Sequence, residues 1–159
     1  MRVALGRRGD YLVRAVLYLA RHPGRQRRED VGREMEIPVK YLPQLMAGAV
    51  DAGIVRSIAG RSGGYLLARD PADVSLLEVI EIAEGPVRST HCALRGGACY
   101  WDDQCAMHAA WSGLEDLVVE RLAGVTFADL ARSDAELEAG SVMRDASQRP
   151  DRRVHHREP

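Results

Sequence analysis

The amino-acid sequence predicts a mainly α-helical fold with one small β-hairpin. Apolar residues recur at helical spacing in several separate segments of the 159-residue chain. Two short strand-like segments flank a glycine-rich stretch at residues 60–64, as in a hairpin. The six helices are expected over residues 9–21, 28–35, 39–52, 75–84, 109–123 and 126–139, and the two strands over residues 54–59 and 65–68.

Short connections separate the first three expected helices. The proline–glycine pair at residues 23–24 ends the first helix, and a basic linker at residues 25–28 leads into the second. Pro38 holds Ile37 out of the helical region, which predicts a tight turn before the third helix. Pro43 would delete a hydrogen bond inside that third helix. Either regular helix begins only near residue 41, or the first turn is distorted.

The second half of the chain has less regular patterning. Residues 87–107 have no clear periodicity and contain all three cysteines, whereas residues 109–123 form a strong helical stripe. Residues 126–129 (TFAD) resemble a capping box that opens a last short helix. Residues 141–159 contain almost no large apolar side chains, so we expect a disordered tail.

The formal net charge of −1 conceals a separation of charge along the chain. Residues 1–61 hold 12 Lys and Arg against 6 Asp and Glu. Residues 62–140 hold 5 Arg against 14 acids, and the tail has a small basic excess. A basic first part suggests a nucleic-acid-binding surface, and the acidic part should face away from phosphate.

Composition also limits the cellular context. The longest mostly apolar run, at residues 11–20, is too short to span a bilayer, and the N-terminus lacks the pattern of a signal peptide. We therefore expect a cytoplasmic protein with no membrane partner. Three cysteines are an odd number, and in a reducing compartment clustered thiols indicate metal or redox chemistry rather than disulfides.

The order helix, short helix, tight turn, helix and glycine-tipped hairpin is that of a winged helix-turn-helix. Its third helix would enter a major groove, where Lys40 could meet phosphate or guanine and Gln44 an adenine edge. Arg61, between glycines at the hairpin tip, could enter a minor groove. The alternative is a set of solvated charges on a small helical core. The predicted DNA-contacting residues are Arg28, Val39, Lys40, Tyr41, Gln44, Arg56 and Arg61.

The irregular segment carries a candidate metal site. Cys92, Cys99, Cys105 and His108 have the spacing C-x6-C-x5-C-x2-H. Three thiolates and an imidazole complete a four-ligand shell that zinc would accept. Wide gaps in a glycine-containing loop are more typical of an iron–sulfur cluster. Three unconnected free cysteines are the other interpretation, which their clustering disfavours.

Six segments also match a known family: GDYLVRA at 9–15, IPVKYLPQL at 37–45, AGIV at 52–55, GRSGGYLLA at 60–68, SLLEVI at 75–80 and CAMHAAW at 105–111. With these segments, about residues 1–135 resemble the IscR/NsrR superfamily of bacterial winged-helix regulators, also called the Rrf2 superfamily. Proline at position 43 is familiar in such sequences.

The resemblance implies a homodimer held by the helix at residues 109–123, with an iron–sulfur cluster in each subunit near the dimer interface. Cys92, Cys99 and Cys105 match the three cysteine ligands. His108 matches the histidine ligand of IscR-like members, which carry a 2Fe-2S cluster. The partner subunit's Asp10 matches the aspartate ligand of NsrR-like members, which carry a 4Fe-4S cluster. The C-x2-H-x2-W context favours His108 and 2Fe-2S.

The sequence therefore predicts a transcriptional regulator, expected to be a repressor, and not an enzyme. An iron–sulfur cluster that senses redox state, nitric oxide or cluster supply would control its affinity for a double-stranded DNA operator, with no small-molecule substrate. The alternatives are the same fold with zinc or no metal in the cysteine loop, and a small iron–sulfur electron-transfer or carrier protein. The predicted units are a DNA-binding domain (1–85), a cluster loop (86–108), a dimerisation unit with the last helix (109–140) and the tail (141–159).

Overall fold

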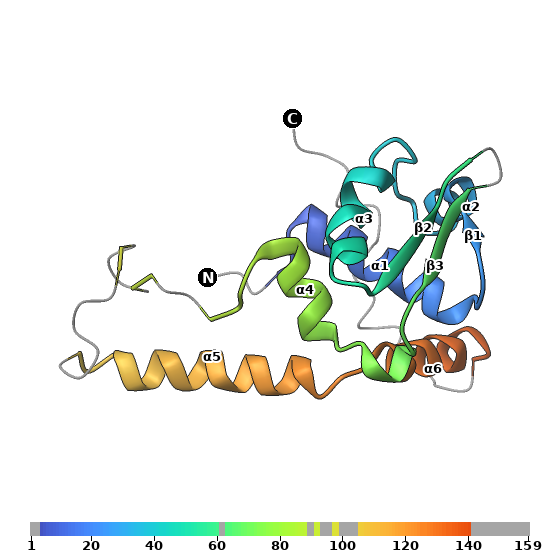
Figure 1. The fold of residues 1–159 in the computed structure, drawn as a ribbon. Helices are drawn as coiled ribbons and strands as arrows, with labels where there is room; N and C mark the ends of the chain where they lie inside the picture. Colours follow the sequence, from blue (N-terminus) through green and yellow to red (C-terminus); the bar gives the residue numbers. More distant parts are fainter. Residues whose placement is uncertain (1–3, 61–62, 89–90, 93–96, 99–104, 141–159) are drawn as a thin grey trace.

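The computed structural model describes residues 4–60, 63–88, 91–92, 97–98 and 105–140. Its described part contains six α-helices, one short 3-10 helix and one three-stranded sheet. Figure 1 shows α1 to α4 and the sheet gathered in one body, from which α5 extends. The elements are α1 (Arg7–Arg21), β1 (Gln26–Arg27), α2 (Arg28–Glu34), α3 (Leu42–Asp51), β2 (Val55–Ile58), β3 (Gly64–Leu67), η1 (Pro71–Asp73), α4 (Leu76–Glu84), α5 (His108–Ala123) and α6 (Phe127–Glu138).

The core is built around α1, whose apolar residues recur every three or four positions. Leu12, Val16 and Leu19 are fully or almost fully buried on that face. They pack in one cluster with Leu45 of α3 and Phe127 of α6, both fully buried. Helices predicted from periodicity thus enclose a single core, and the predicted mainly helical winged fold is confirmed.

The third helix begins later than predicted. Val39 and Lys40 lie in the turn before α3, where Tyr41 donates its N–H to the Pro38 carbonyl at 2.8 Å. This bond joins residues three apart and closes a turn rather than an α-helical ring. Pro43 then falls in the first turn of α3, where its missing N–H has no helical partner to lose. Of the two predicted arrangements, the later helix start is correct.

The sheet has one strand more than predicted. Its order is β1-β3-β2, and β3 pairs with both neighbours in antiparallel fashion. The expected basic linker contributes the short strand β1, whose Gln26 lies opposite Tyr65. A Cβ atom on Gly64 would lie only 1.9 Å from the Gln26 carbonyl oxygen. The two strands therefore approach this closely only because residue 64 is glycine.

The last helix packs back onto the first. Thr126 and Asp129 form the predicted capping box at the start of α6. At the other end, Arg21 of α1 donates hydrogen bonds to Asp134 at 2.7 Å and to Glu138 at 2.5 Å. The hydrogen bond from Arg21 lowers the pKa of the Glu138 carboxyl. The predicted boundaries between structural units at residues 85 and 108 stay predictions. Phe127 of α6, however, packs in the same core as α1.

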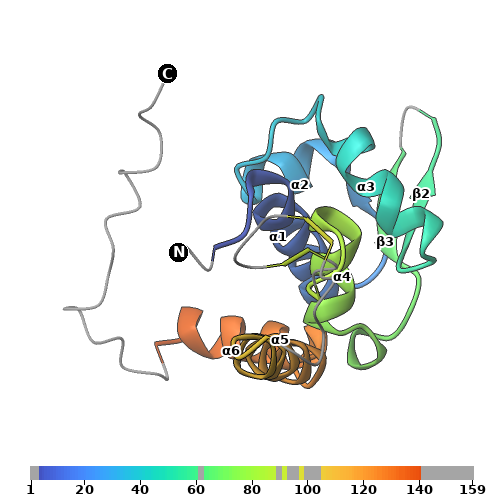
Figure 2. The same cartoon turned by 90° about the vertical axis from the view of Figure 1, so that its left-hand side faces the viewer.

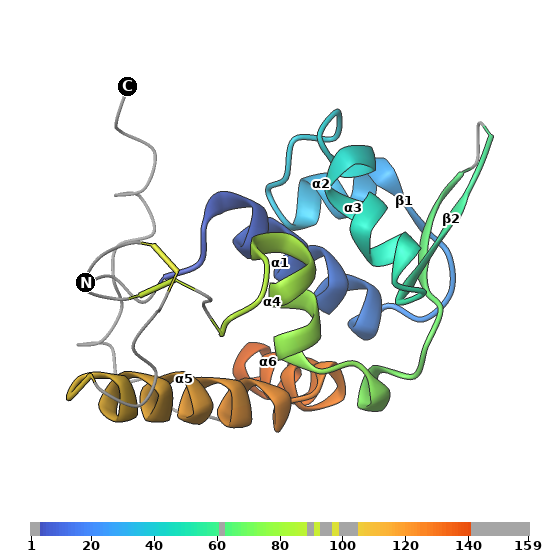
Figure 3. The same ribbon diagram turned by 60° about the vertical axis from the view of Figure 1, so that its left-hand side comes forward.

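The helices divide the molecule into two sides. Figures 2 and 3 show α5 and α6 along one side, and α2, α3 and the sheet toward the other, with α1 and α4 between them. No helix within the described residues is long and apolar enough to cross a membrane.

Candidate DNA-binding surface and cysteine segment

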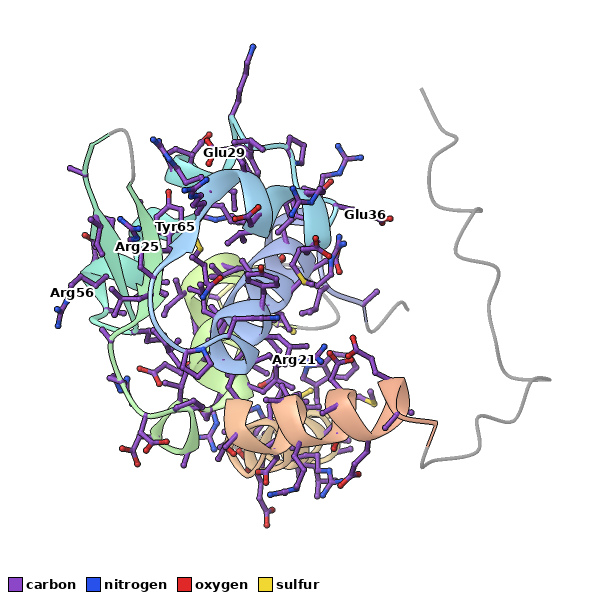
Figure 4. The ribbon with its side chains drawn as sticks, turned by 90° about the vertical axis from the view of Figure 1, so that its right-hand side faces the viewer. Arg21, Arg25, Glu29, Glu36, Arg56 and Tyr65 are labelled. Carbon is purple, nitrogen blue, oxygen red and sulfur yellow. The ribbon has the colours of Figure 1, made fainter. Side chains whose placement is uncertain are left out.

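The predicted DNA-contacting residues that the structure describes surround α3 and the wing, by which we mean β2, β3 and their connection. Lys40 is exposed in the turn before α3, and Gln44 is exposed on the first turn of the helix. Arg28 is the first residue of α2 and is exposed. Arg56 of β2 points outward from the sheet (Figure 4). These four side chains are therefore accessible to a duplex that contacts α3 and the wing.

Two other predicted residues have a partly structural role. Val39 is exposed, but a Cβ on Gly32 would lie only 2.6 Å from its Cγ2 atom. The turn before α3 therefore packs closely on α2. Tyr41 is half-buried, and its ring meets the Tyr11 ring edge to face at a centroid distance of 6.2 Å. Tyr41 thus joins α1 to the start of α3. Arg61 lies outside the described residues.

Charge pairing differs between this surface and the rest of the molecule. Arg28, Lys40 and Arg56 form no ion pair with any residue that the structure describes. By contrast, Arg21 pairs with two carboxylates of α6, and Arg69 pairs with α4. No described carboxylate neutralises the three cations around α3, so they are available to pair with phosphate.

The cysteine segment joins α4 to α5. Cys92 donates its N–H to the Gly97 carbonyl at 2.6 Å, and His91 forms a β-bridge with Ala98, so this part of the segment folds back on itself. A second turn precedes α5, where the His108 N–H donates to the Cys105 carbonyl at 2.9 Å.

The donor set of this segment fits an iron–sulfur cluster. Cys92 and Cys105 are half-buried, and His108 is half-buried at the first residue of α5. The turn that ends at His108 brings its Cα within about 7 Å of that of Cys105. Three thiolates and an imidazole are established cluster ligands. Cys99, the third thiol, lies outside the described residues, and no three His, Cys, Asp or Glu residues among the described ones gather into a metal site.

Asp10, the alternative ligand, is already engaged in the single chain. Its two carboxylate oxygens accept hydrogen bonds from Nε and Nη2 of Arg14 at 3.1 and 2.5 Å. Arg14 also donates to the carbonyl of Met35, at the end of α2. Exposed ion pairs contribute at most about 1 kcal/mol, so Arg14 would not prevent Asp10 from binding elsewhere.

The end of α4, which precedes the cysteine segment, is tied to α1 by a contact that the sequence did not reveal. The Gly9 N–H, in the first turn of α1, donates to Oε1 of Glu84 at 2.8 Å. A Cβ on Gly6 or Gly9 would collide with the Glu84 carboxylate. Two glycines three residues apart could have indicated a close contact at the start of α1, but they do not identify Glu84, 75 residues further along the chain, as the partner.

Helix α5 carries apolar side chains that the single chain leaves uncovered. None of the 16 residues of α5 is buried. Leu117 is 64% exposed, Leu114 is 40% exposed, and Met107 just before the helix is 45% exposed. Exposed large apolar groups on one element are typical of an interaction surface.

The sequence matches a known family over most of its length. Residues 5–133 match the model of the Rrf2 family, described as an iron-dependent transcriptional regulator. The chain belongs to the Rrf2 family. It is 31% identical over 147 residues to the HTH-type transcriptional regulator IscR of Cronobacter sakazakii, covering 91% of this chain and 90% of the relative. It is 32% identical over 150 residues to IscR of Photorhabdus laumondii, covering 92% and 91% of the two chains.

Solved structures of Rrf2 regulators have the same fold. CymR of B. subtilis, described as the global cysteine regulator, superposes with a TM-score of 0.71 at 26% identity, covering 83% of this chain and 98% of CymR. IscR of T. potens has a TM-score of 0.68 at 28% identity, covering 89% and 94%. This Rrf2 protein is therefore a winged-helix transcriptional regulator and not an enzyme, as the sequence predicted.

Proposed function

We propose that this Rrf2 protein is a homodimeric repressor whose affinity for operator DNA is controlled by an iron–sulfur cluster. Cys92, Cys99, Cys105 and His108 would hold the cluster. The position of the cysteine segment carries this proposal, since it leads from α4, which packs on the DNA-binding elements, into the uncovered helix α5. The description of the matching family as an iron-dependent transcriptional regulator supports an iron-containing cofactor.

His108 is our preferred fourth ligand, with a 2Fe-2S cluster. Its backbone turn with Cys105 already holds two ligands of one subunit near each other. Asp10 of a partner subunit would give up its hydrogen bonds from Arg14 at a cost of at most about 1 kcal/mol, so the preference for His108 rests on its turn with Cys105. When bound, the cluster would supply a centre that reacts with oxidants and nitric oxide.

DNA recognition would use α3 and the wing together. Gln44 lies on the exposed face of α3 and would read a base edge, while Lys40 in the preceding turn would meet phosphate or guanine. Arg28 and Arg56 would neutralise backbone phosphates on either side. Arg61 would enter the minor groove, as the sequence predicts.

Dimerisation would place two such heads on one operator. The apolar side chains of α5 would pack against α5 of a second copy, since a twofold interface uses the same patch on both subunits. Two heads then bind half-sites about one helical turn apart. A change of a few ångströms in their spacing would weaken specific binding and leave charge-driven, non-specific binding in place.

The contacts of the described residues lead from the end of α4, just before the cysteine segment, to the helix-turn-helix. Glu84, at the end of α4, holds the first turn of α1 through Gly9. From the next turn of α1, Arg14 holds the Met35 carbonyl, where the turn toward α3 begins. A rearrangement of the segment that moved Glu84 would therefore move the helix-turn-helix relative to α5.

Anaerobic purification with a visible spectrum and iron and sulfide counts tests the cofactor. We expect two irons and two sulfides per chain in the wild type and an altered spectrum in His108→Ala. His91→Ala, in the same segment, is the matched control and should keep the wild-type spectrum. Asp10→Asn keeps an acceptor for Arg14 but removes the carboxylate ligand. A changed spectrum in Asp10→Asn with an unchanged one in His108→Ala would reverse our ligand assignment.

A zinc-bound or metal-free cysteine segment is the second candidate. The structural similarity to CymR, described as the global cysteine regulator of B. subtilis, favours this candidate. Protein without visible absorption or sulfide would exclude the cluster, and a zinc count would then separate the two forms of this candidate. Operator binding by such protein would leave the regulator function intact.

A further inference from the structure

A pocket of about 570 Å³ lies between α3 and the wing. We call it the helix–wing pocket. Its apolar wall comes from α3, and its polar groups come from the wing, the start of α2 and the C-terminal end of α3. Its lining includes Arg28, Asp51, Ser57 and Tyr65.

Tyr65, a largely buried residue that carries a hydroxyl group, lines this pocket. The residue is only 5% exposed, and no residue that the structure describes forms a hydrogen bond with its hydroxyl. The hydroxyl is nevertheless not sealed from solvent, since no buried, unpartnered side-chain oxygen is found among the described residues. Ser57 lies directly opposite Tyr65 in the β2–β3 ladder, so both side chains are on the same face of the sheet.

Arg28 supplies the charge beside this hydroxyl. Burial raises the pKa of Tyr65, and the nearby Arg28 guanidinium acts in the opposite direction. Tyr65 therefore stays protonated at neutral pH and can donate its O–H. Arg28 has no ion-pair partner among the described residues. The guanidinium and the two hydroxyls form a set of donors suited to phosphate oxygens.

The location of the pocket indicates which phosphate would occupy it. A duplex that receives α3 in its major groove and the wing in the adjoining minor groove must pass one strand's backbone between them, because a backbone separates the two grooves. We propose that the helix–wing pocket holds one backbone phosphodiester of the operator, to which Tyr65 and Arg28 donate hydrogen bonds. The proposal rests on the proposed DNA-binding function and adds Tyr65 to its contacts.

The carboxylate of Asp51 in the pocket would oppose phosphate binding. It is the acidic residue among the described lining residues, and it lies at the C-terminal end of α3. A carboxylate near a bound phosphate weakens binding by repulsion. Asp51→Asn should therefore strengthen DNA binding, whereas loss of a donor should weaken it.

The first test compares variants on an operator selected from random DNA with the wild-type dimer. Tyr65→Phe removes only the hydroxyl and should raise the dissociation constant about tenfold per half-site, or about 100-fold for a dimer on both half-sites, as expected for a hydrogen bond to a charged group. Its salt dependence should equal that of wild type, because no charge is lost. Arg28→Ala should also weaken binding and reduce the slope of log K against log salt by about 0.9 per subunit, or about 1.8 for the dimer.

Tyr18→Phe is the matched control. Tyr18 is 7% exposed and also has a raised pKa from burial, but its charged neighbours include Asp30 and Glu34, which repel phosphate. Its hydroxyl should not affect operator affinity. Circular dichroism and melting of each variant verify that it is folded.

The second test places neutral methylphosphonate at single backbone positions of the operator. At one position in each half-site, wild type should lose more than tenfold, and Tyr65→Phe should lose about tenfold less than wild type, because the variant already lacks the Tyr65 hydrogen bond and loses only the contact with Arg28. Equal affinity of Tyr65→Phe and wild type for native operator overturns the proposal. So does a weakened Tyr65→Phe that no single methylphosphonate position masks.

Two further outcomes distinguish a backbone phosphate from a free anion and from a failure of DNA binding itself. If inorganic phosphate at fixed ionic strength stabilises wild type but not Tyr65→Phe, and DNA affinity is equal, the pocket binds a free anion and the DNA assignment is wrong. If wild type binds no selected operator, the proposed function itself fails. If Lys40→Ala weakens binding and Tyr65→Phe does not, only the phosphate site fails.

Discussion

Leu117 offers a quantitative test of dimerisation through α5. It is the most exposed large apolar side chain that the structure describes, at 64% of its surface. If α5 is the dimer interface, the substitution Leu117→Ala should weaken dimerisation and leave the fold of each chain intact, because the side chain is not part of the core of the single chain.

The size of the effect follows from the exposed area. Leucine to alanine removes three carbons, worth about 0.8 kcal/mol each when fully buried, or about 2.4 kcal/mol. Dimerisation can cover only the 64% that the single chain leaves exposed, which reduces this to about 1.5 kcal/mol. Twofold symmetry counts it twice, and about 3 kcal/mol corresponds to a dissociation constant raised about 100-fold.

Sedimentation equilibrium over a range of protein concentrations measures this constant. Where the wild-type dimer is too tight, the concentration dependence of the unfolding midpoint replaces it, since association stabilises the folded state by mass action. Ile58→Ala, an exposed apolar residue of the wing, is the control and should not change dimerisation. An unchanged dimer in Leu117→Ala, or a monomeric wild type at tens of micromolar, would refute the reasoning.

Three stability predictions concern α3 and α6. Thr126→Ala removes the acceptor for the Asp129 N–H and should lower the free energy of unfolding by about 1 kcal/mol in urea titrations, whereas Ser133→Ala, exposed on the same helix, should not. Gly48→Ala should cost about 1–3 kcal/mol in the same assay, because its Cβ would lie 2.8 Å from Ile82 Cγ2. The hydrogen bond from Thr126 lowers the pKa of Asp129, so its contribution is present above the unfolded pKa of about 3.9 and lost as pH falls. Asp129→Asn should flatten the loss of stability in that acidic range.

Helix positions followed from the sequence where side-chain burial decides the structure. The stripe of Leu12, Val16 and Leu19 could be predicted because a 3.6-residue period places those residues on one face. The start of α3 could not, because residues 38–41 close a turn through bonds between residues three apart. Apolar spacing does not distinguish such a turn from a first helical turn. Strand β1 was missed because two residues have no period, and because its pairing depends on the missing side chain of Gly64.

The candidate site divides in the same way. The exposure of Lys40, Gln44 and Arg56 could be predicted, since each lies off the apolar face of its element. The contact of Glu84 with Gly9 could not, because it joins residues distant in the sequence through one carboxylate. The cysteine spacing indicated which residues could donate to a metal or cluster. It did not give the geometry of the site, because that depends on the backbone conformation between the ligand residues.

The separation of the two sites imposes a condition on any regulation. In Figure 1, the described residues of the cysteine segment and α5 lie to the left, and α3 with β2 and β3 lies to the right. Coupling between them must therefore act through elements that contact both, and α4 packs on α1, α3 and α5. Linkage makes that coupling reciprocal. If the cluster changes operator affinity tenfold, bound operator must change cluster affinity by the same factor, so DNA would alter the extent of cluster loss from this Rrf2 protein at equilibrium.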